Sequence, residues 1–353
     1  MKLHTDIFLK VMGLILFLSG QVISGISQQN QSPPSPQKFQ PPPPPKQSPI
    51  SEWVLSDTIM NHTKPLPFRM WVGPATKHIR GLIVAPKVWA EEDFVNNPAI
   101  RKVAAEEDLA IIKTDGKNFA MFDITKGEDT LFLRVLHKIA VLSGFPEIEF
   151  APWLTFGHST AGHFAKNLAF WKPERTFGIL YFKSGQFHSP SWTKPGTSLH
   201  NIPILFINGQ FEEFGPHGQH APGESPESQW RAVRDTLMLL RKSNYLVSFI
   251  VAPGEGHFAL TQRVADYMAL FIKKAAYYKI PRNTITTNGS INLNEIKESS
   301  GFLSDTCISA LTVHPDKRLI NVIQPYKKFP TKEISFWHFD DEIAQAWLKF
   351  YHP

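Results

Sequence analysis

Short runs of apolar residues alternate with longer amphipathic stretches along most of the chain. The short runs predict strands buried on both faces, because polar residues rarely interrupt them. The longer stretches place apolar residues three or four positions apart, which predicts helices with one buried face. This alternation predicts an α/β fold, with a mostly parallel sheet covered by helices on both faces. We expect strands at Trp53–Leu55, Phe68–Val72, Ile79–Val84, Leu109–Ile112, Trp153–Phe156, Phe177–Phe182, Ile202–Ile207 and Leu246–Val251, and helices at Pro98–Glu107, Thr130–Leu142, Ala161–Trp171, Ser225–Lys242 and Leu260–Tyr277.

Residues 283–353 break this alternation. They contain Asn-Gly and Pro-Asp turns, short strand-like runs at Leu319–Ile323 and Ile334–Phe339, and a final helical stretch at Asp340–Phe350. We expect a small mixed extension packed on the preceding core. Its aromatic residues are expected to form that packing rather than a ligand platform; they are Trp337, Phe339, Trp347, Phe350 and Tyr351.

The first 49 residues do not have the composition of a folded core. Residues 1–29 read as a secretory signal peptide, with an apolar segment at Val11–Leu18 and small residues around Gly25 and Ser27. The apolar segment is too short to span a bilayer, so we expect cleavage and no stable membrane insertion. Residues 30–49 are rich in proline and are expected to form an extended linker.

The predicted organisation is therefore a signal peptide at 1–29, a linker at 30–49, a core at 50–282 and the C-terminal extension at 283–353. The expected location is secreted or periplasmic. Cys307 is the single cysteine, which excludes an intrachain disulfide and fits a bacterial periplasm or exterior.

Charge and composition exclude several classes of function. The 37 Lys and Arg residues exceed the 31 Asp and Glu residues only modestly, and they are scattered. They lack the clustered basic and aromatic pattern of nucleic-acid binding, so no nucleic-acid partner is expected. No zinc-binding spacing and no glycine-rich phosphate loop is present, so we expect neither a metal nor a cofactor. The sequence leaves the oligomeric state open.

Ser159 lies between a predicted strand and a predicted helix, in the stretch Phe156-Gly157-His158-Ser159-Thr160-Ala161-Gly162. A serine at the tip of such a tight turn adopts a strained backbone, and its neighbours must be small. Gly157, Ala161 and Gly162 meet that requirement. The turn exposes the Ser159 hydroxyl and aims the Thr160 N–H at the same point, where it would stabilise an oxyanion.

Parallel sheets carry their chemistry just after the carboxyl ends of the strands, and two further candidates lie at such positions. Glu212 and Glu213 follow the strand predicted at Ile202–Ile207, and His257 follows the one at Leu246–Val251. A serine hydroxyl needs a neighbouring imidazole to take its proton, and the imidazole needs a carboxylate to orient it. The set predicts a catalytic Ser159, His257 and Glu212, with Glu213 as the alternative acid.

These motifs, in the order Gly157-His158-Ser159-Thr160-Ala161-Gly162, Gly209-x-x-Glu212 and Gly254-x-Gly256-His257, resemble the α/β-hydrolase superfamily. The resemblance covers about residues 50–278. It is greatest to secreted esterases of the dienelactone hydrolase and polyhydroxybutyrate-depolymerase-like type. The acid of those enzymes is more usually Asp, whereas this chain has Glu.

The resemblance also implies a second oxyanion donor just after the third strand. Pro86 has no N–H to donate, so the backbone N–H of Lys87 or Val88 is the candidate. Four side chains are candidates for lining the substrate cleft, and Trp89 is equally a candidate for the core. The four are Trp89, His158, Phe211 and Phe214.

The sequence therefore predicts an exported serine hydrolase that cleaves carboxylic esters, including polymer-linked ones, through an acyl-enzyme. Two alternatives stay open. The same triad serves peptidases and acyltransferases, since fold and triad support many chemistries. A non-catalytic protein could also use a hydrolase scaffold to bind a polymer.

Overall fold

The computed structural model describes residues 53–61, 64–86, 90–115, 119, 121–185, 187–212, 228–282, 289, 291–305 and 323–351. Within them, an eight-stranded sheet has the order β1-β2-β4-β3-β5-β6-β7-β8. The expected signal peptide and linker lie outside the described residues. The strands are β1 (Leu55–Asn61), β2 (Lys64–Trp71), β3 (Gly81–Pro86), β4 (Leu109–Thr114), β5 (Trp153–His158), β6 (Thr176–Phe182), β7 (Ile204–Gly209) and β8 (Val247–Ala252).

The six strands from β3 to β8 pair in parallel, and every residue in them is buried. Their continuous apolar runs are the pattern of a sheet covered on both faces. The mostly parallel, doubly covered sheet confirms the predicted fold class.

The N-terminal hairpin is the antiparallel part of the sheet. β1 pairs with β2 along its whole length, and β2 then pairs antiparallel with β4. Pro65 and Pro67 lie in the part of β2 that pairs with β1 alone, since the pairing to β4 starts at Phe68. Proline cannot donate to a second neighbouring strand, so this position suits it.

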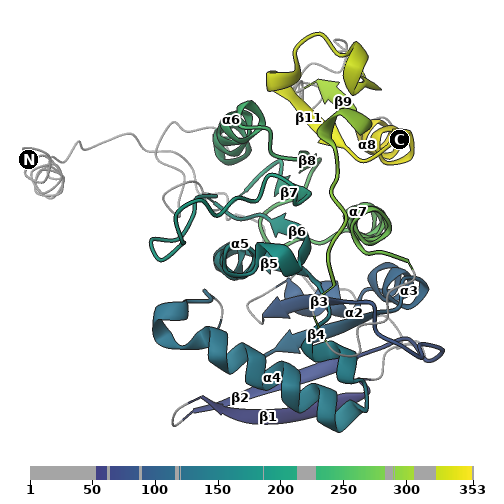
Figure 1. Ribbon diagram of the computed structural model, residues 1–353. Helices are drawn as coiled ribbons and strands as arrows, with labels where there is room; N and C mark the ends of the chain where they lie inside the picture. Colours follow the sequence, from purple (N-terminus) through teal and green to yellow (C-terminus); the bar gives the residue numbers. More distant parts are fainter. Residues whose placement is uncertain are drawn as a thin grey trace, which may run out of the picture. The chain divides into compact units, whose positions relative to one another are not determined.

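Helices cover both faces of the sheet, with α4, α5 and α6 on one side and α3 and α7 on the other (Figure 1). Local sequence sets their ends. Asn97 caps α3 by accepting the Ala99 N–H at 2.9 Å, and Gly144 ends α4 in the left-handed conformation. The helices are α2 (Glu91–Asn96), α3 (Pro98–Glu106), α4 (Glu128–Ser143), α5 (Gly162–Trp171), α6 (Ser228–Lys242), α7 (Gln262–Lys279) and α8 (Asp341–Tyr351).

The C-terminal region forms a small antiparallel sheet in the order β10-β9-β11, followed by α8. The strands are β9 (Phe302–Asp305), β10 (Ile323–Pro325) and β11 (Ser335–His338). Its aromatic side chains join it to β8: the Trp347 indole donates to the Phe249 carbonyl at 2.8 Å, and the Tyr351 hydroxyl accepts the Val251 N–H at 2.8 Å. Both rings therefore act in packing. The strand run expected at Leu319–Ile323 lies outside the described residues except for Ile323, where β10 begins, and the helix start expected at Ser225 lies outside them as well.

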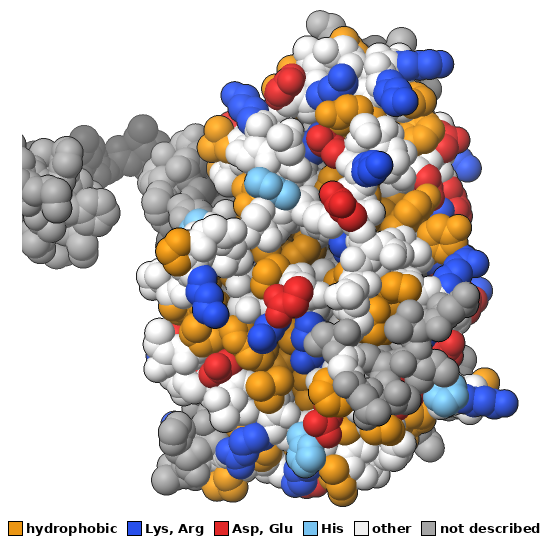
Figure 2. Space-filling model, viewed as in Figure 1, with side chains coloured by type: hydrophobic (Ala, Val, Ile, Leu, Met, Phe, Trp, Pro, Cys, Tyr) orange, Lys and Arg blue, Asp and Glu red, His pale blue; other side chains and the backbone are white. Residues whose placement is uncertain are grey.

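Charge is mixed on the face that Figure 2 presents, where basic and acidic side chains are interspersed. Among the described residues, no helix combines the length and the apolar character needed to cross a membrane. In the same residues, no cluster of three or more His, Cys, Asp or Glu side chains has the geometry to hold a metal ion.

Candidate active site

Ser159 occupies the sharp turn between β5 and α5. Its φ is 53°, in the left-handed region that a residue with a side chain rarely adopts. Neighbouring glycines make the turn possible. A Cβ on Gly157 would lie 1.9 Å from the Ala161 carbonyl oxygen, and one on Gly162 would lie 2.0 Å from the Ser184 hydroxyl. The turn therefore has the strain and the close packing that its sequence predicts.

Two polar contacts hold this turn from either side. The Ser184 hydroxyl donates to the Ser159 carbonyl oxygen at 2.7 Å. On the strand side, the His158 N–H donates to a carboxylate oxygen of Glu91, in α2, at 2.8 Å. Both His158 and Glu91 are fully buried, so the turn is fixed in a water-poor environment.

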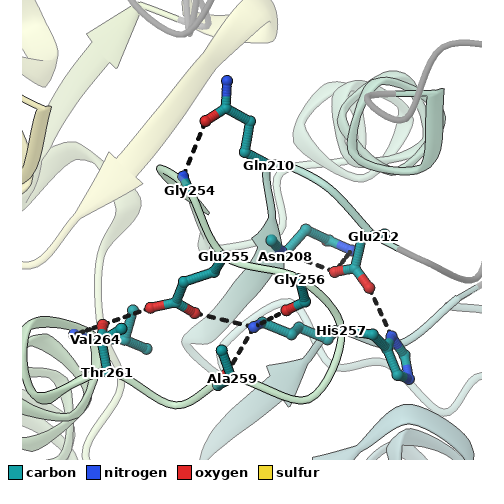
Figure 3. Close-up of polar contacts among 12 residues, drawn as sticks. Asn208, Gln210, Glu212, Gly254, Glu255, Gly256, His257, Ala259, Thr261 and Val264 are labelled. Carbon is teal, nitrogen blue, oxygen red and sulfur yellow. Dashed lines mark hydrogen bonds and ion pairs between the residues drawn. The ribbon is translucent and has the colours of Figure 1, made fainter. Parts of the chain in front are cut away.

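His257 and Glu212 form a hydrogen-bonded pair across the ends of β7 and β8 (Figure 3). The distance from His257 Nδ1 to Glu212 Oε2 is 2.6 Å, and Glu212 is only 1% exposed. The other Glu212 oxygen accepts the Gly209 N–H at 2.7 Å and lies 3.4 Å from the Asn208 side-chain nitrogen. A carboxylate held in this way favours the imidazole tautomer with its proton on Nδ1 and its lone pair on Nε2.

Ser159 and His257 line the same cavity, whose volume is about 360 Å³. Thr160 lines it as well. The apolar wall of the cavity comes from the segment after β6, from β7 and from one face of α6, through Phe187, Phe206, Val233 and Leu237. The polar wall includes His163, Gln229 and Thr236. Burial is the largest influence on His163 and lowers its pKa, which keeps its imidazole neutral near pH 7.

His158 lies behind the pair rather than in the lining of the cavity. Its Nε2 is 2.9 Å from the His257 carbonyl oxygen, and the two rings are 4.8 Å apart. Burial lowers the pKa of His158 to about 3, so the ring is neutral and Nε2–H is the donor. Nδ1 makes no hydrogen bond to any residue that the structure describes. His158 thus supports the backbone of His257.

Of the remaining predicted site residues, some are described by the structure and others are not. Phe211 is 46% exposed and its N–H donates to the Glu255 carbonyl oxygen at 2.9 Å. Glu213, Lys87, Trp89 and Phe214 lie outside the described residues, as does Val88. The alternative acid and the second oxyanion donor therefore stay predictions.

Three polar residues near the site were missed at the sequence level: Lys183, Ser184 and Glu255. Lys183 and Ser184 directly follow β6, and Glu255 follows β8 beside His257. The same strand-end criterion that singled out His257 would have found them. Their burial could not be read from the sequence, because a lysine and a glutamate in loops are ordinarily solvated.

The order of the sheet, together with a strained serine directly after β5, defines an α/β-hydrolase fold. No model of a known protein family matches the sequence, and no curated protein matches it. Solved structures that resemble it include the poly(3-hydroxybutyrate) depolymerase LpqC from Bordetella parapertussis, at 15% identity and a TM-score of 0.43, over 63% of this chain and 87% of that one.

Two further structures show a comparable likeness. An S-formylglutathione hydrolase from Agrobacterium tumefaciens has 15% identity and a TM-score of 0.41, over 63% of this chain and 93% of that one. The siderophore hydrolase EstA from Aspergillus nidulans has 13% identity and a TM-score of 0.43, over 62% of this chain and 93% of that one. These values are too low to indicate an activity, so the function is inferred from the site itself.

Proposed function

We propose that the chain is a serine hydrolase that cleaves carboxylic esters, with Ser159 as nucleophile, His257 as base and Glu212 as the orienting acid. The observation that carries the proposal is the 2.6 Å contact between His257 and a buried Glu212, at a cavity that Ser159 also lines. Nucleophile, base and acid follow β5, β8 and β7 at one edge of the sheet.

The reaction follows from these positions. Nε2 of His257 takes the proton as Ser159 Oγ attacks the ester carbonyl, and the Glu212 carboxylate stabilises the imidazolium that forms. The Thr160 N–H and a second amide, expected at Lys87 or Val88, hold the oxyanion. The imidazolium then protonates the departing alcohol, which leaves an acyl-enzyme on Ser159.

Water completes the cycle by the same steps. His257 takes a proton from water, the resulting hydroxide attacks the acyl carbonyl, and the proton returns to Ser159 Oγ as the acid departs. The cavity limits the group that it can enclose. A volume of about 360 Å³ lies near the lower end of the roughly 300–1,000 Å³ range of ligand pockets. We therefore propose an ester in which one side is compact and largely apolar.

We also propose that the protein is exported, because residues 1–29 have the pattern of a signal peptide and the proline-rich residues 30–49 have that of a linker. An exported hydrolase meets esters outside the cytoplasm, including those attached to polymers. Terminal sequencing of the protein recovered from the medium or periplasm of an expressing bacterium checks this part, and a chain that keeps residues 1–29 there contradicts it.

The test is hydrolysis of p-nitrophenyl esters of increasing acyl length by the parent, by Ser159→Ala and by Ser243→Ala. Ser243 is the matched control, because it is exposed directly after α6 and its hydroxyl donates to the Leu239 carbonyl of that helix at 3.2 Å. Loss of a triad nucleophile lowers kcat by about 10⁶-fold, whereas Ser243→Ala should match the parent. Equal rates for Ser159→Ala and the parent would contradict the proposal. A parallel p-nitroanilide series separates ester from amide hydrolysis.

A further inference from the structure

Lys183 is a buried cation with all of its hydrogen-bond donors used. It follows β6 with a φ of 46°, and its side chain is 0% exposed. The ammonium donates to Glu255 Oε2 at 2.9 Å, to the Ala259 carbonyl at 2.6 Å and to the Gly256 carbonyl. An ammonium has three N–H donors, so these three acceptors satisfy it. A lysine bound in this way offers neither a base nor a cation for substrate.

The three acceptors all belong to the loop that carries His257, residues 253–261. Glu255 and Gly256 precede the histidine, and Ala259 follows it two residues later. Figure 3 shows the Glu255 side chain reaching Thr261, the last residue of this loop. The Thr261 hydroxyl donates to the second Glu255 oxygen, and Thr261 also caps the start of α7. Lys183 and Glu255 therefore join the His257 loop to β6 on one side and to α7 on the other.

Ser184, the next residue, holds the other half of the site. Its hydroxyl donates to the Ser159 carbonyl oxygen at 2.7 Å, and it packs so closely on Gly162 that a Cβ there would collide with it. The hydroxyl proton is committed to this contact, which is a reason not to regard Ser184 as a second nucleophile. Two consecutive residues after β6 thus contact the nucleophile turn and the histidine loop.

We propose that Lys183 and Ser184 are positioning residues that set the placement of His257 relative to Ser159, with Glu255 as the partner of Lys183. This inference rests on the proposed hydrolase function. The left-handed backbone of Lys183 supports it, because strain at a residue with a side chain persists where the surrounding contacts over-determine the conformation. We call the contacts of Lys183, Ser184 and Glu255 with the Ser159 turn and the His257 loop the clamp. A displacement of about 1 Å between catalytic groups can cost about 100-fold in rate, so loss of the clamp should have a large effect on kcat.

The experiment compares Lys183→Met with Lys279→Met. Lys279 is the matched control, since it is also buried and donates to a backbone carbonyl, that of Asn294 at 2.7 Å. It is the last residue of the 18-residue helix α7, about 25 Å from the start of that helix. Two readouts are taken on the folded proteins: kcat and KM on the best p-nitrophenyl ester, and hydrogen–deuterium exchange of peptides that cover residues 253–261.

For Lys183→Met we expect faster exchange in residues 253–261, by at least about tenfold, and a fall in kcat of about 100-fold with KM within about threefold of the parent. Lys279→Met should change neither. Unchanged exchange in the loop would overturn the clamp. Faster exchange with an unchanged kcat would overturn its role in positioning His257.

Two milder variants keep the proposal testable if Lys183→Met does not fold. Glu255→Gln keeps the shape of the side chain and removes its charge, and Ser184→Ala removes the hydroxyl that contacts the Ser159 carbonyl and the Tyr181 side chain. Each should lower kcat by about tenfold at an unchanged KM, and parent-like kinetics in both would overturn the proposal. The exchange readout needs no turnover, so a parent without esterase activity would contradict the proposed function and leave the clamp to be judged on its own.

Discussion

Two regions of the molecule contain the same two features, a buried cation and a buried histidine. One region lies at the carboxyl ends of the strands around His257, and the other attaches the C-terminal extension. Each has a buried cation that reaches across the chain: Lys183 bonds the His257 loop, and Arg241 bonds Glu298 at 2.7 Å and the Ser335 carbonyl at 2.9 Å. Each also has a fully buried histidine, His158 in the first region and His338 in the second.

The difference between the two regions lies in what the contacts hold. Lys183 and His158 both bond the loop of His257, whereas Arg241 and His338 bond segments of the extension. Under the proposed function, these contacts set catalytic geometry in the first region, whereas in the second Arg241 joins α6 to the extension and His338 bonds Ser304 within it. Substitutions in the first region should change rate, and those in the second should change stability.

The largest expected effect is on kcat, and it distinguishes Glu212, the proposed triad acid, from Glu298, an acid of the extension. Glu212→Gln removes the charge that stabilises the imidazolium, and it should lower kcat by about 10⁴-fold. Glu298→Gln is the matched control and should leave kcat unchanged, because Glu298 bonds Arg241 and the Tyr326 hydroxyl, both outside the cavity lining. Steady-state kinetics on one ester measures both. A Glu212→Gln variant within tenfold of the parent would assign the acid elsewhere, with Glu213 the first candidate.

The next effect concerns stability. Arg241→Met removes the guanidinium that bonds the Glu298 carboxylate and the carbonyls of Ser335, Tyr245 and Lys332, so the free energy of unfolding should fall by about 3 kcal/mol or more. Urea unfolding measures the loss. The kcat of the folded fraction should match the parent, in contrast to Lys183→Met. A large fall in kcat for Arg241→Met would show that the extension also orders the catalytic edge.

The smallest effect is on the pH dependence of stability. Burial is the main cause that lowers the pKa of both His158 and His338 to about 3, from about 6.5 in the unfolded chain. The unfolded chain therefore binds more protons, so this stability is present above pH 6.5 and is lost as the pH falls towards 3.

Each of these histidines should remove about 2 kcal/mol from the free energy of unfolding between pH 7 and pH 5. His338→Gln should abolish about half of the combined loss, as measured by urea unfolding at the two pH values. An identical pH dependence in the parent and in His338→Gln would contradict the neutral state of that ring.

The sequence predicted the parts of the fold that depend on local pattern. The apolar runs that became β3 to β8 were recognisable because both faces of those strands are buried. The hairpin was only partly predicted, because β1 is mostly polar and partly exposed, and because Pro65 and Pro67 interrupt β2. The helix α2 was missed, since six residues give too little periodicity to detect.

The candidate site was likewise predictable only where its residues have a local sequence signature. The turn at Ser159 and the acid three residues after Gly209 have local signatures, and the structure places Glu212 against His257. The clamp has none, because Lys183 and Glu255 lie 72 residues apart and meet only through the pairing of β6, β7 and β8. Reading a buried ion pair from sequence requires knowing which strand ends are neighbours.

The most direct test of the central claim is covalent labelling of the protein with a fluorophosphonate, followed by mass spectrometric mapping of the adduct. The reagent modifies a serine hydroxyl that a neighbouring base activates. The account predicts one adduct, on Ser159, formed at least about 1,000-fold more slowly in His257→Ala. An adduct on another serine, or equal labelling rates in the parent and in His257→Ala, would contradict the assignment of Ser159 and His257 as nucleophile and base.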